Sequence, residues 1–134
     1  METEKLYKLA TENGITLDFY PMPKTVSAAV NLCGRYFVAI DPAVFGNTAL
    51  ERVCLAHELG HCQTGSIYNI YSPLDIREKH EKRANKWAVD QLVPRAELEK
   101  AIKNGYREIS ELAEYFSVTE DFMKKAIEIY KNRT

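Results

Sequence analysis

The chain has 134 residues with a formal net charge of −1, and 46% of its residues are hydrophobic. This length fits one domain with its own core, and the balanced charge argues against a general binder of nucleic acid or anionic membranes. No stretch resembles a signal peptide or approaches the roughly 18 apolar residues of a membrane span. The three cysteines, Cys33, Cys54 and Cys62, fit no disulfide framework, so we expect a cytoplasmic protein.

The first 40 residues predict one helix followed by short strands. Residues 3–13 carry leucines and an alanine at helical spacing. Residues 15–20 alternate well enough for a strand, which two prolines then end. Residues 27–32 and 36–40 are β-prone and flank a short turn at Gly34, a pattern typical of a hairpin. We therefore predict a small antiparallel sheet near the N-terminus.

The rest of the chain predicts helices. Thr48 and Glu51 form a capping-box pattern, and the helix they begin should run to about Thr64, where Gly65 stops it. Residues 65–76 are predicted to form a loop. Further helices are predicted at residues 77–92, 95–103, 108–116 and 119–131. The expected fold class is α+β, with the sheet packed on the central helix that begins near Thr48, then a second long helix and three shorter ones.

The motif His57-Glu58-Leu59-Gly60-His61 lies on the central helix. Residues four apart share one helix face, so both imidazoles can bind a single ion, while Glu58 borders the same edge. Metal coordination lowers the pKa of a water molecule, and a nearby carboxylate can take its proton. Apolar neighbours indicate a buried helix, in which an unpartnered histidine pair would be costly. Gly60 in mid-helix costs about 1 kcal/mol relative to alanine, which suggests a close approach to the backbone.

A third ligand is predicted on the second long helix. Glu81 falls on the inward stripe of that helix among alanines and a leucine, where an unpaired carboxylate would be strongly unfavourable. His80 is the competing ligand, but it lies about 100° around the helix. Asn85 follows Glu81 by one turn and could hold a ligand imidazole by its second nitrogen, or it could be a polar packing contact.

Three protein ligands, His57, His61 and Glu81, leave a coordination position open, which is the catalytic arrangement of zinc. We therefore expect one Zn²⁺ per chain, although Mn²⁺ or Fe²⁺ could use the same ligands. Cys54 and Cys62 lack Cys-x-x-Cys spacing, and we interpret both as core residues.

Two separate motifs now make a family resemblance visible. The first motif is Leu55 to His61, and the second is Glu81 to Ala88, which closes with Leu92-Val93-Pro94. With these motifs the chain resembles the ImmA/IrrE family of zinc metallopeptidases. The likeness is clearest over residues 30–95, and the C-terminal helices resemble the tail of phage-type members. Trp87 stands where phenylalanine is common, and Gln91-Leu92-Val93-Pro94 replaces a more apolar ending of the type Leu-Leu-Met-Pro; neither change touches a ligand.

The resemblance implies a gluzincin-like site with His57, His61 and Glu81 on the metal and Glu58 as the base. It implies a single metallopeptidase domain over residues 1–134, with a catalytic core at 1–94 and a helical subregion at 95–134. It further implies cleavage of a helix-turn-helix repressor of a prophage or mobile element.

Two further features concern how a substrate would be held. Tyr68, Tyr71 and His80 are candidates for a second group that stabilises the oxyanion, although each is individually more typical of a structural residue. Residues 36–40 are expected to offer a sheet edge on which an extended substrate adds as a strand.

Two alternatives to a peptidase are considered. Residues 109–127 have helix-turn-helix-like spacing, but the second helix opens with Glu120 and Asp121, which would repel phosphates. We therefore expect a packed helix pair without direct nucleic-acid binding. The other alternative is a non-proteolytic metal-binding module that regulates a transcriptional repressor.

Overall fold

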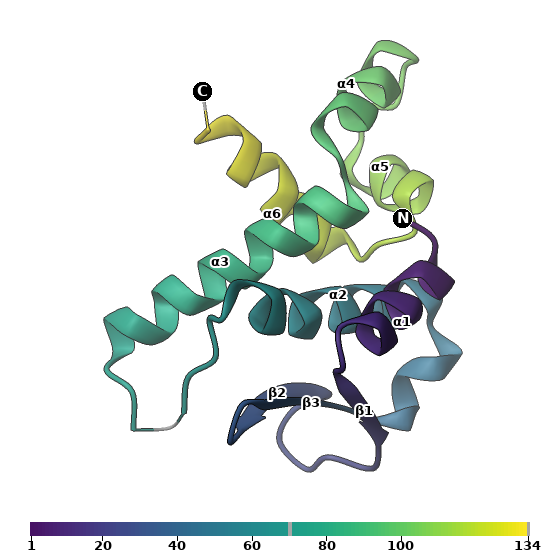
Figure 1. Cartoon of the computed structure of the whole chain (residues 1–134). Coiled ribbons are helices and arrows are strands. Elements are labelled where there is room, and N and C mark those ends of the chain that lie inside the picture. The colour runs from purple at the N-terminus through teal and green to yellow at the C-terminus, as the bar shows by residue number, and fades with distance from the viewer. Residues whose placement is uncertain (70, 134) are drawn as a thin grey trace.

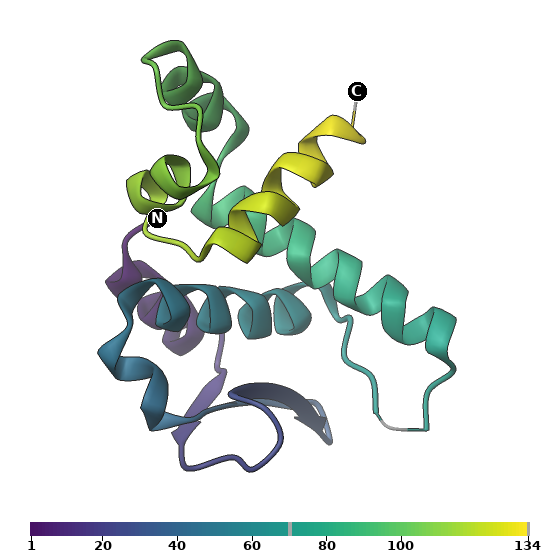
Figure 2. The ribbon, with the colours of Figure 1, turned by 180° about the vertical axis from the view of Figure 1, so that it is seen from behind.

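The computed structural model describes residues 1–69 and 71–133. A three-stranded sheet forms one layer, α2 lies across it, and the later helices pack on the other side of α2 (Figures 1 and 2). The elements are α1 (Thr3–Glu12), β1 (Thr16–Phe19), β2 (Ser27–Leu32), β3 (Arg35–Ile40), the 3-10 helix η1 (Pro42–Gly46), α2 (Thr48–Thr64), α3 (Leu74–Leu92), α4 (Arg95–Lys103), α5 (Ile109–Phe116) and α6 (Glu120–Lys131). The α+β class is confirmed.

The sheet is mixed, so the expectation of a wholly antiparallel sheet is wrong. Its order is β1-β3-β2, with β2 antiparallel and β1 parallel to β3. The hairpin between β2 and β3 is confirmed: Cys33 and Gly34 have φ of 53° and 86°, as a tight two-residue turn requires. Because β3 pairs on both sides, the prediction that residues 36–40 form a free edge is also wrong. The alternation of apolar and polar residues along a strand does not indicate which strands are neighbours or whether they run parallel.

α2 is the central element of the core. Leu55, Ala56 and Leu59 are completely buried. Its N-cap is Asn47, whose side chain accepts a hydrogen bond from the backbone N–H of Leu50 over 3.1 Å, so the predicted Thr48 capping box is one residue late. At the other end Gly65 adopts φ 65° and stops the helix as predicted.

α3 packs directly on α2 and begins at Leu74, three residues before the predicted start. Pro73 provides the N-cap, and its carbonyl accepts from the N–H of Arg77 over 3.0 Å. The two helices approach closely at Gly60, where an added Cβ would lie 2.6 Å from the carbonyl oxygen of Ala84. The mid-helix glycine therefore admits the backbone of α3.

The three C-terminal helices lie within one residue of their predicted bounds. α5 and α6 pack on one another, and α6 crosses α3 (Figure 1). Tyr130 on α6 donates to the carbonyl of Val93 over 2.7 Å. Among the described residues, no helix is both long and apolar enough to cross a membrane.

Candidate metal centre

The two motif histidines occupy one face of α2. Their ring centroids are 4.7 Å apart and the planes are nearly perpendicular, at 88°. The Nε2 atoms of His57 and His61 lie 3.2 Å from one another. The i, i+4 spacing on a buried helix produces this convergence, as the motif predicts.

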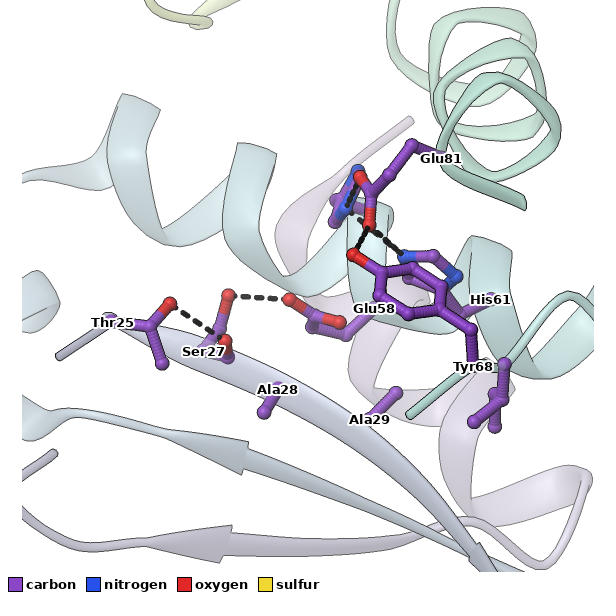
Figure 3. Close-up of a pocket in the computed structure, with 10 residues that line it drawn as sticks. Thr25, Ser27, Ala28, Ala29, Glu58, His61, Tyr68 and Glu81 are labelled. Atoms are coloured by element: carbon purple, nitrogen blue, oxygen red, sulfur yellow. Dashed lines mark hydrogen bonds and ion pairs between the residues drawn. The ribbon is translucent and has the colours of Figure 1, made fainter. Parts of the chain in front are cut away.

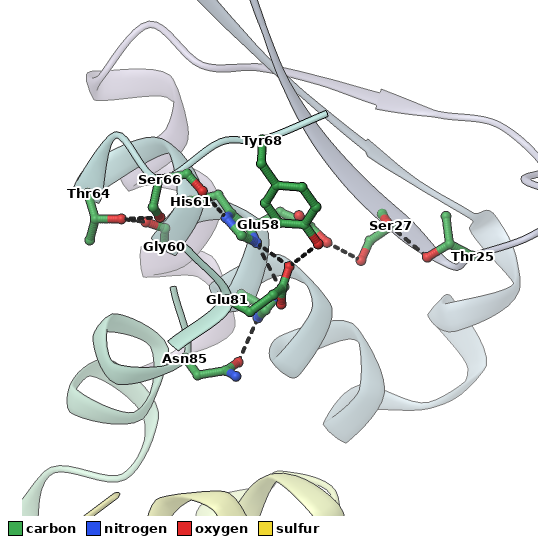
Figure 4. Close-up of polar contacts among 11 residues, drawn as sticks. Thr25, Ser27, Glu58, Gly60, His61, Thr64, Ser66, Tyr68, Glu81 and Asn85 are labelled. Atoms are coloured by element: carbon green, nitrogen blue, oxygen red, sulfur yellow. Dashed lines mark hydrogen bonds and ion pairs between the residues drawn. The ribbon is translucent and has the colours of Figure 1, made fainter. Parts of the chain in front are cut away.

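Glu81 reaches the histidines from α3, across the Gly60 contact. Its Oε2 lies 2.9 Å from His57 Nε2, and its Oε1 lies 3.1 Å from His61 Nε2. Figure 4 shows the carboxylate of Glu81 beside the ring of His61. The three side chains offer ligand atoms within 4.8 Å of one another, so these residues could hold a metal ion.

The contacts of the two Nδ1 atoms determine which tautomer each histidine adopts. His61 Nδ1 lies 2.7 Å from the carbonyl oxygen of Ser66, which only accepts, so this nitrogen carries the proton. His57 Nδ1 is bound in the same way by Asn85 Oδ1 at 2.8 Å. In the neutral imidazoles the Nε2 lone pairs then face each other and a carboxylate. Such a set of converging lone pairs fits a cation.

The directions in which the pKa values of Glu81 and His61 shift agree with a negative carboxylate between the two imidazoles. Burial opposes ionisation of Glu81, but its contacts with the imidazoles of His57 and His61 and the hydrogen bond from Tyr68 hold its pKa far below the usual range. Burial likewise disfavours the charged form of His61, yet its contacts with Glu81 and the Ser66 carbonyl raise its pKa. The carboxylate is thus ionised and draws positive charge toward the imidazoles.

Glu58 lies beside the cluster without joining it. It is 6% exposed, and burial raises its pKa even though His57 and a hydrogen bond from Ser27 act in the opposite direction. Ser27 Oγ donates to Glu58 Oε2 over 2.7 Å, and Figure 3 shows this contact across the space between β2 and α2. No local pattern in the chain indicates a role for Ser27, because only the packing of β2 on α2 brings it to the motif.

A cavity of about 470 Å³ opens over these groups. β2 forms one wall with Ser27, Ala28 and Ala29, and the loop after α2 contributes Tyr68. The histidines, Glu58 and Glu81 line the same space (Figure 3). The site is therefore open to a ligand along the first half of β2, from Ser27 to Ala29.

The three candidates for stabilising the oxyanion, Tyr68, Tyr71 and His80, lie in different surroundings. Tyr68 donates to Glu81 Oε1 over 2.7 Å, and this bond together with burial raises its pKa to about 12. His80 packs edge-on against Tyr68, with centroids 6.3 Å apart, and contributes no atom to the metal group. Tyr71 is 88% exposed and is absent from the cavity wall among the described residues, so its proposed role receives no support.

Cys54 and Cys62 are buried and free, as expected for core residues. Burial raises the pKa of Cys62 to about 12, which keeps a thiol rather than a metal-binding thiolate. Neither cysteine contributes to the group of converging ligand atoms in the described chain.

An α+β fold whose His-Glu-x-x-His helix meets a carboxylate from the next helix defines the class of zincin-like metallopeptidases. The model of the IrrE N-terminal-like domain of the M78 peptidases matches residues 10–128, and the chain belongs to this family, the ImmA/IrrE metallopeptidases. A search among curated proteins found no match to this chain.

Proposed function

We propose that this protein is a cytoplasmic zinc-dependent endopeptidase that cleaves a helix-turn-helix repressor of a prophage or mobile element. The observation that carries the hydrolytic part is the convergence of His57, His61 and Glu81 beside the buried carboxylate of Glu58. The repressor substrate is supported by the family resemblance, and the cytoplasmic setting by the free cysteines.

Two imidazoles and one carboxylate are the ligand set of catalytic zinc in several peptidases, and they leave a position for water or substrate. A divalent cation there would polarise the scissile carbonyl and lower the pKa of the attacking water. Asn85 and the Ser66 carbonyl fix the imidazole tautomers that such a cation requires.

Glu58 is the general base of the proposed reaction. Its carboxylate takes a proton from water as the water oxygen attacks the peptide carbonyl, and then returns this proton to the leaving amine as the C–N bond breaks. The Ser27 hydroxyl holds one carboxylate oxygen.

Tyr68 is the best-placed group to stabilise the oxyanion. Its hydroxyl lines the cavity beside Glu81, and a pKa raised to about 12 keeps it protonated at neutral pH. A protonated phenol can donate to the negative oxygen that develops during attack.

The substrate backbone is proposed to add to β2 rather than to residues 36–40. β2 pairs only with β3, so its other edge has backbone groups that can bind an extended peptide. Ala28 and Ala29 on this strand line the cavity, and their small side chains leave room for the peptide.

The test is incubation of the purified protein with the helix-turn-helix protein encoded beside it, with and without a chelator. We expect cleavage that the chelator abolishes, detected by gel electrophoresis and mass spectrometry. Metal retention without cleavage of the repressor would contradict the peptidase proposal and favour the metal-binding interaction module.

Glu58→Gln provides the sharper control on the base. We expect metal binding to persist, while the cleavage rate falls by about 100- to 10,000-fold because the base is lost. Metal content by mass spectrometry and cleavage rate are measured on the same preparation. A variant that cleaves at the wild-type rate would show that another group takes the proton.

A further inference from the structure

The cavity over the metal cluster continues past Asn85 toward α6. A second cavity of about 280 Å³ shares Ser27, His57 and Glu81 with the first and extends to Lys125 on α6. A third, of about 400 Å³, shares Asn85 and Lys125 with the second and lies between α3 and α6. The three cavities thus adjoin through shared wall residues along a path from the cluster to α6, and in Figure 4 the ribbon of α6 lies on the Asn85 side of the cluster.

The far part of this path, called here the α3–α6 groove, is positively charged. Lys82 and Lys86 line it from α3 and Lys125 from α6; all three are exposed, and none forms an ion pair with another described residue. Arg133 also lines the groove, but it is paired with Asp90 at 2.8 Å. Glu128 is the acidic residue of the groove wall, so the three unpaired lysines outnumber it.

Lys82 and Lys86 are four residues apart and therefore share one face of α3. This face borders Asn85, which holds His57. The positive charge therefore lies beside the cluster, where a bound chain would pass.

We propose that the α3–α6 groove is a specificity site that binds acidic side chains of the substrate polypeptide, on the α6 side of the scissile bond. This inference rests on the proposed peptidase function. A peptide is favoured over a nucleic acid because Glu128 lines the groove itself and Asp121 lines the adjoining cavity together with Lys125. They would repel a continuous phosphate backbone, whereas carboxylates spaced along a peptide can contact the lysines alone.

The test measures binding rather than cleavage, using the zinc-loaded Glu58→Gln protein. Fluorescence anisotropy follows a labelled peptide in which an apolar segment precedes a run of glutamates, and the same peptide with lysines in their place. We expect the acidic peptide to bind about tenfold more tightly, with a preference that weakens as salt is added. Equal binding of the two peptides would overturn the proposal.

Charge reversal locates the site. Lys86→Glu combined with Lys125→Glu should remove the preference for the acidic peptide, whereas the matched double variant Lys100→Glu with Lys103→Glu, both exposed on α4, should retain it. Unchanged preference in the double variant would overturn the proposal, as would single-stranded DNA binding more tightly than the acidic peptide. Because cleavage plays no part here, an inactive wild type would count against the proposed function alone.

Discussion

The histidines of the cluster are each held at both ring nitrogens. Nδ1 of His57 meets Asn85, and Nδ1 of His61 meets the carbonyl of Ser66, so each Nε2 is aimed inward before any ion binds. A ligand that is already oriented loses less conformational freedom on binding. Asn85 and Ser66 would therefore contribute to the affinity of this site for a metal ion without contacting the ion.

Asn85→Ala should weaken metal binding by about 10- to 100-fold, because His57 loses the contact that fixes its tautomer and ring orientation. Competition with a chromogenic chelator measures this affinity. Asn85→Asp keeps the accepting oxygen and is the matched control, which should retain most of the affinity. An alanine variant with wild-type affinity would show that Asn85 is only a packing residue.

At the scale of elements, the site depends on how closely α3 approaches α2. Gly60 and Ala84 provide this approach, and Glu81 lies one turn before Ala84. A larger residue at 60 would move the carboxylate away from the imidazoles. The same contact thus positions a metal ligand and forms part of the core.

Gly60→Ala should lower the free energy of unfolding by about 1–3 kcal/mol, because its Cβ would overlap the backbone of α3. The gain of about 1 kcal/mol in helix propensity offsets only part of this cost. Gly46→Ala, with nothing within 4 Å of the added Cβ, is the control and should be close to neutral. Urea unfolding measures both; equal stability of the two variants would contradict the clash.

Arg52 joins three elements. It is 7% exposed on α2, and it donates to Ser117 and Phe116 at the end of α5 and to Thr3 on α1. Its positive charge also faces the negative end of the α5 dipole. The guanidinium therefore satisfies two carbonyls at the end of α5, of which the Phe116 carbonyl would otherwise be buried without a donor.

Arg52→Met should destabilise the fold by about 1–3 kcal/mol, since it leaves the buried Phe116 carbonyl unsatisfied. Arg95→Met is the matched control: Arg95 is half exposed and pairs only with Glu99, so its loss should cost less than about 1 kcal/mol. Thermal unfolding followed by circular dichroism compares them. A loss at position 52 no greater than at 95 would refute the linking role.

For the whole molecule, the metal would act as a crosslink between α2 and α3. Only the folded chain brings His57, His61 and Glu81 together, so metal binding stabilises the native state by mass action. The benefit extends to the core, because the two helices form the interface between the sheet and the C-terminal helices.

Zinc at about 100 times its dissociation constant should contribute about 2.7 kcal/mol and raise the Tm by roughly 10 °C. Differential scanning fluorimetry with and without a chelator measures the shift. Glu81→Gln, which removes one ligand and preserves side-chain volume, should lose most of it. A Tm that is insensitive to zinc in the wild type would argue against binding at this cluster.

Local signals in the chain were sufficient for the metal motif and for most helices. His57 and His61 lie four residues apart, and helix geometry alone brings such residues to one face. The apolar surroundings of Glu81 likewise marked its inward position. Gly60 in mid-helix indicated that another part of the chain approaches its backbone closely, although only the structure shows that this neighbour is Ala84 on α3.

Long-range packing decided what local patterns could not. The parallel pairing of β1, the edge position of β2 and the Ser27–Glu58 hydrogen bond all join residues distant in the chain. The α3–α6 groove exists only because α6 crosses α3. Periodicity reports which face of an element is apolar, but the choice of neighbour depends on how all the faces fit together in one core.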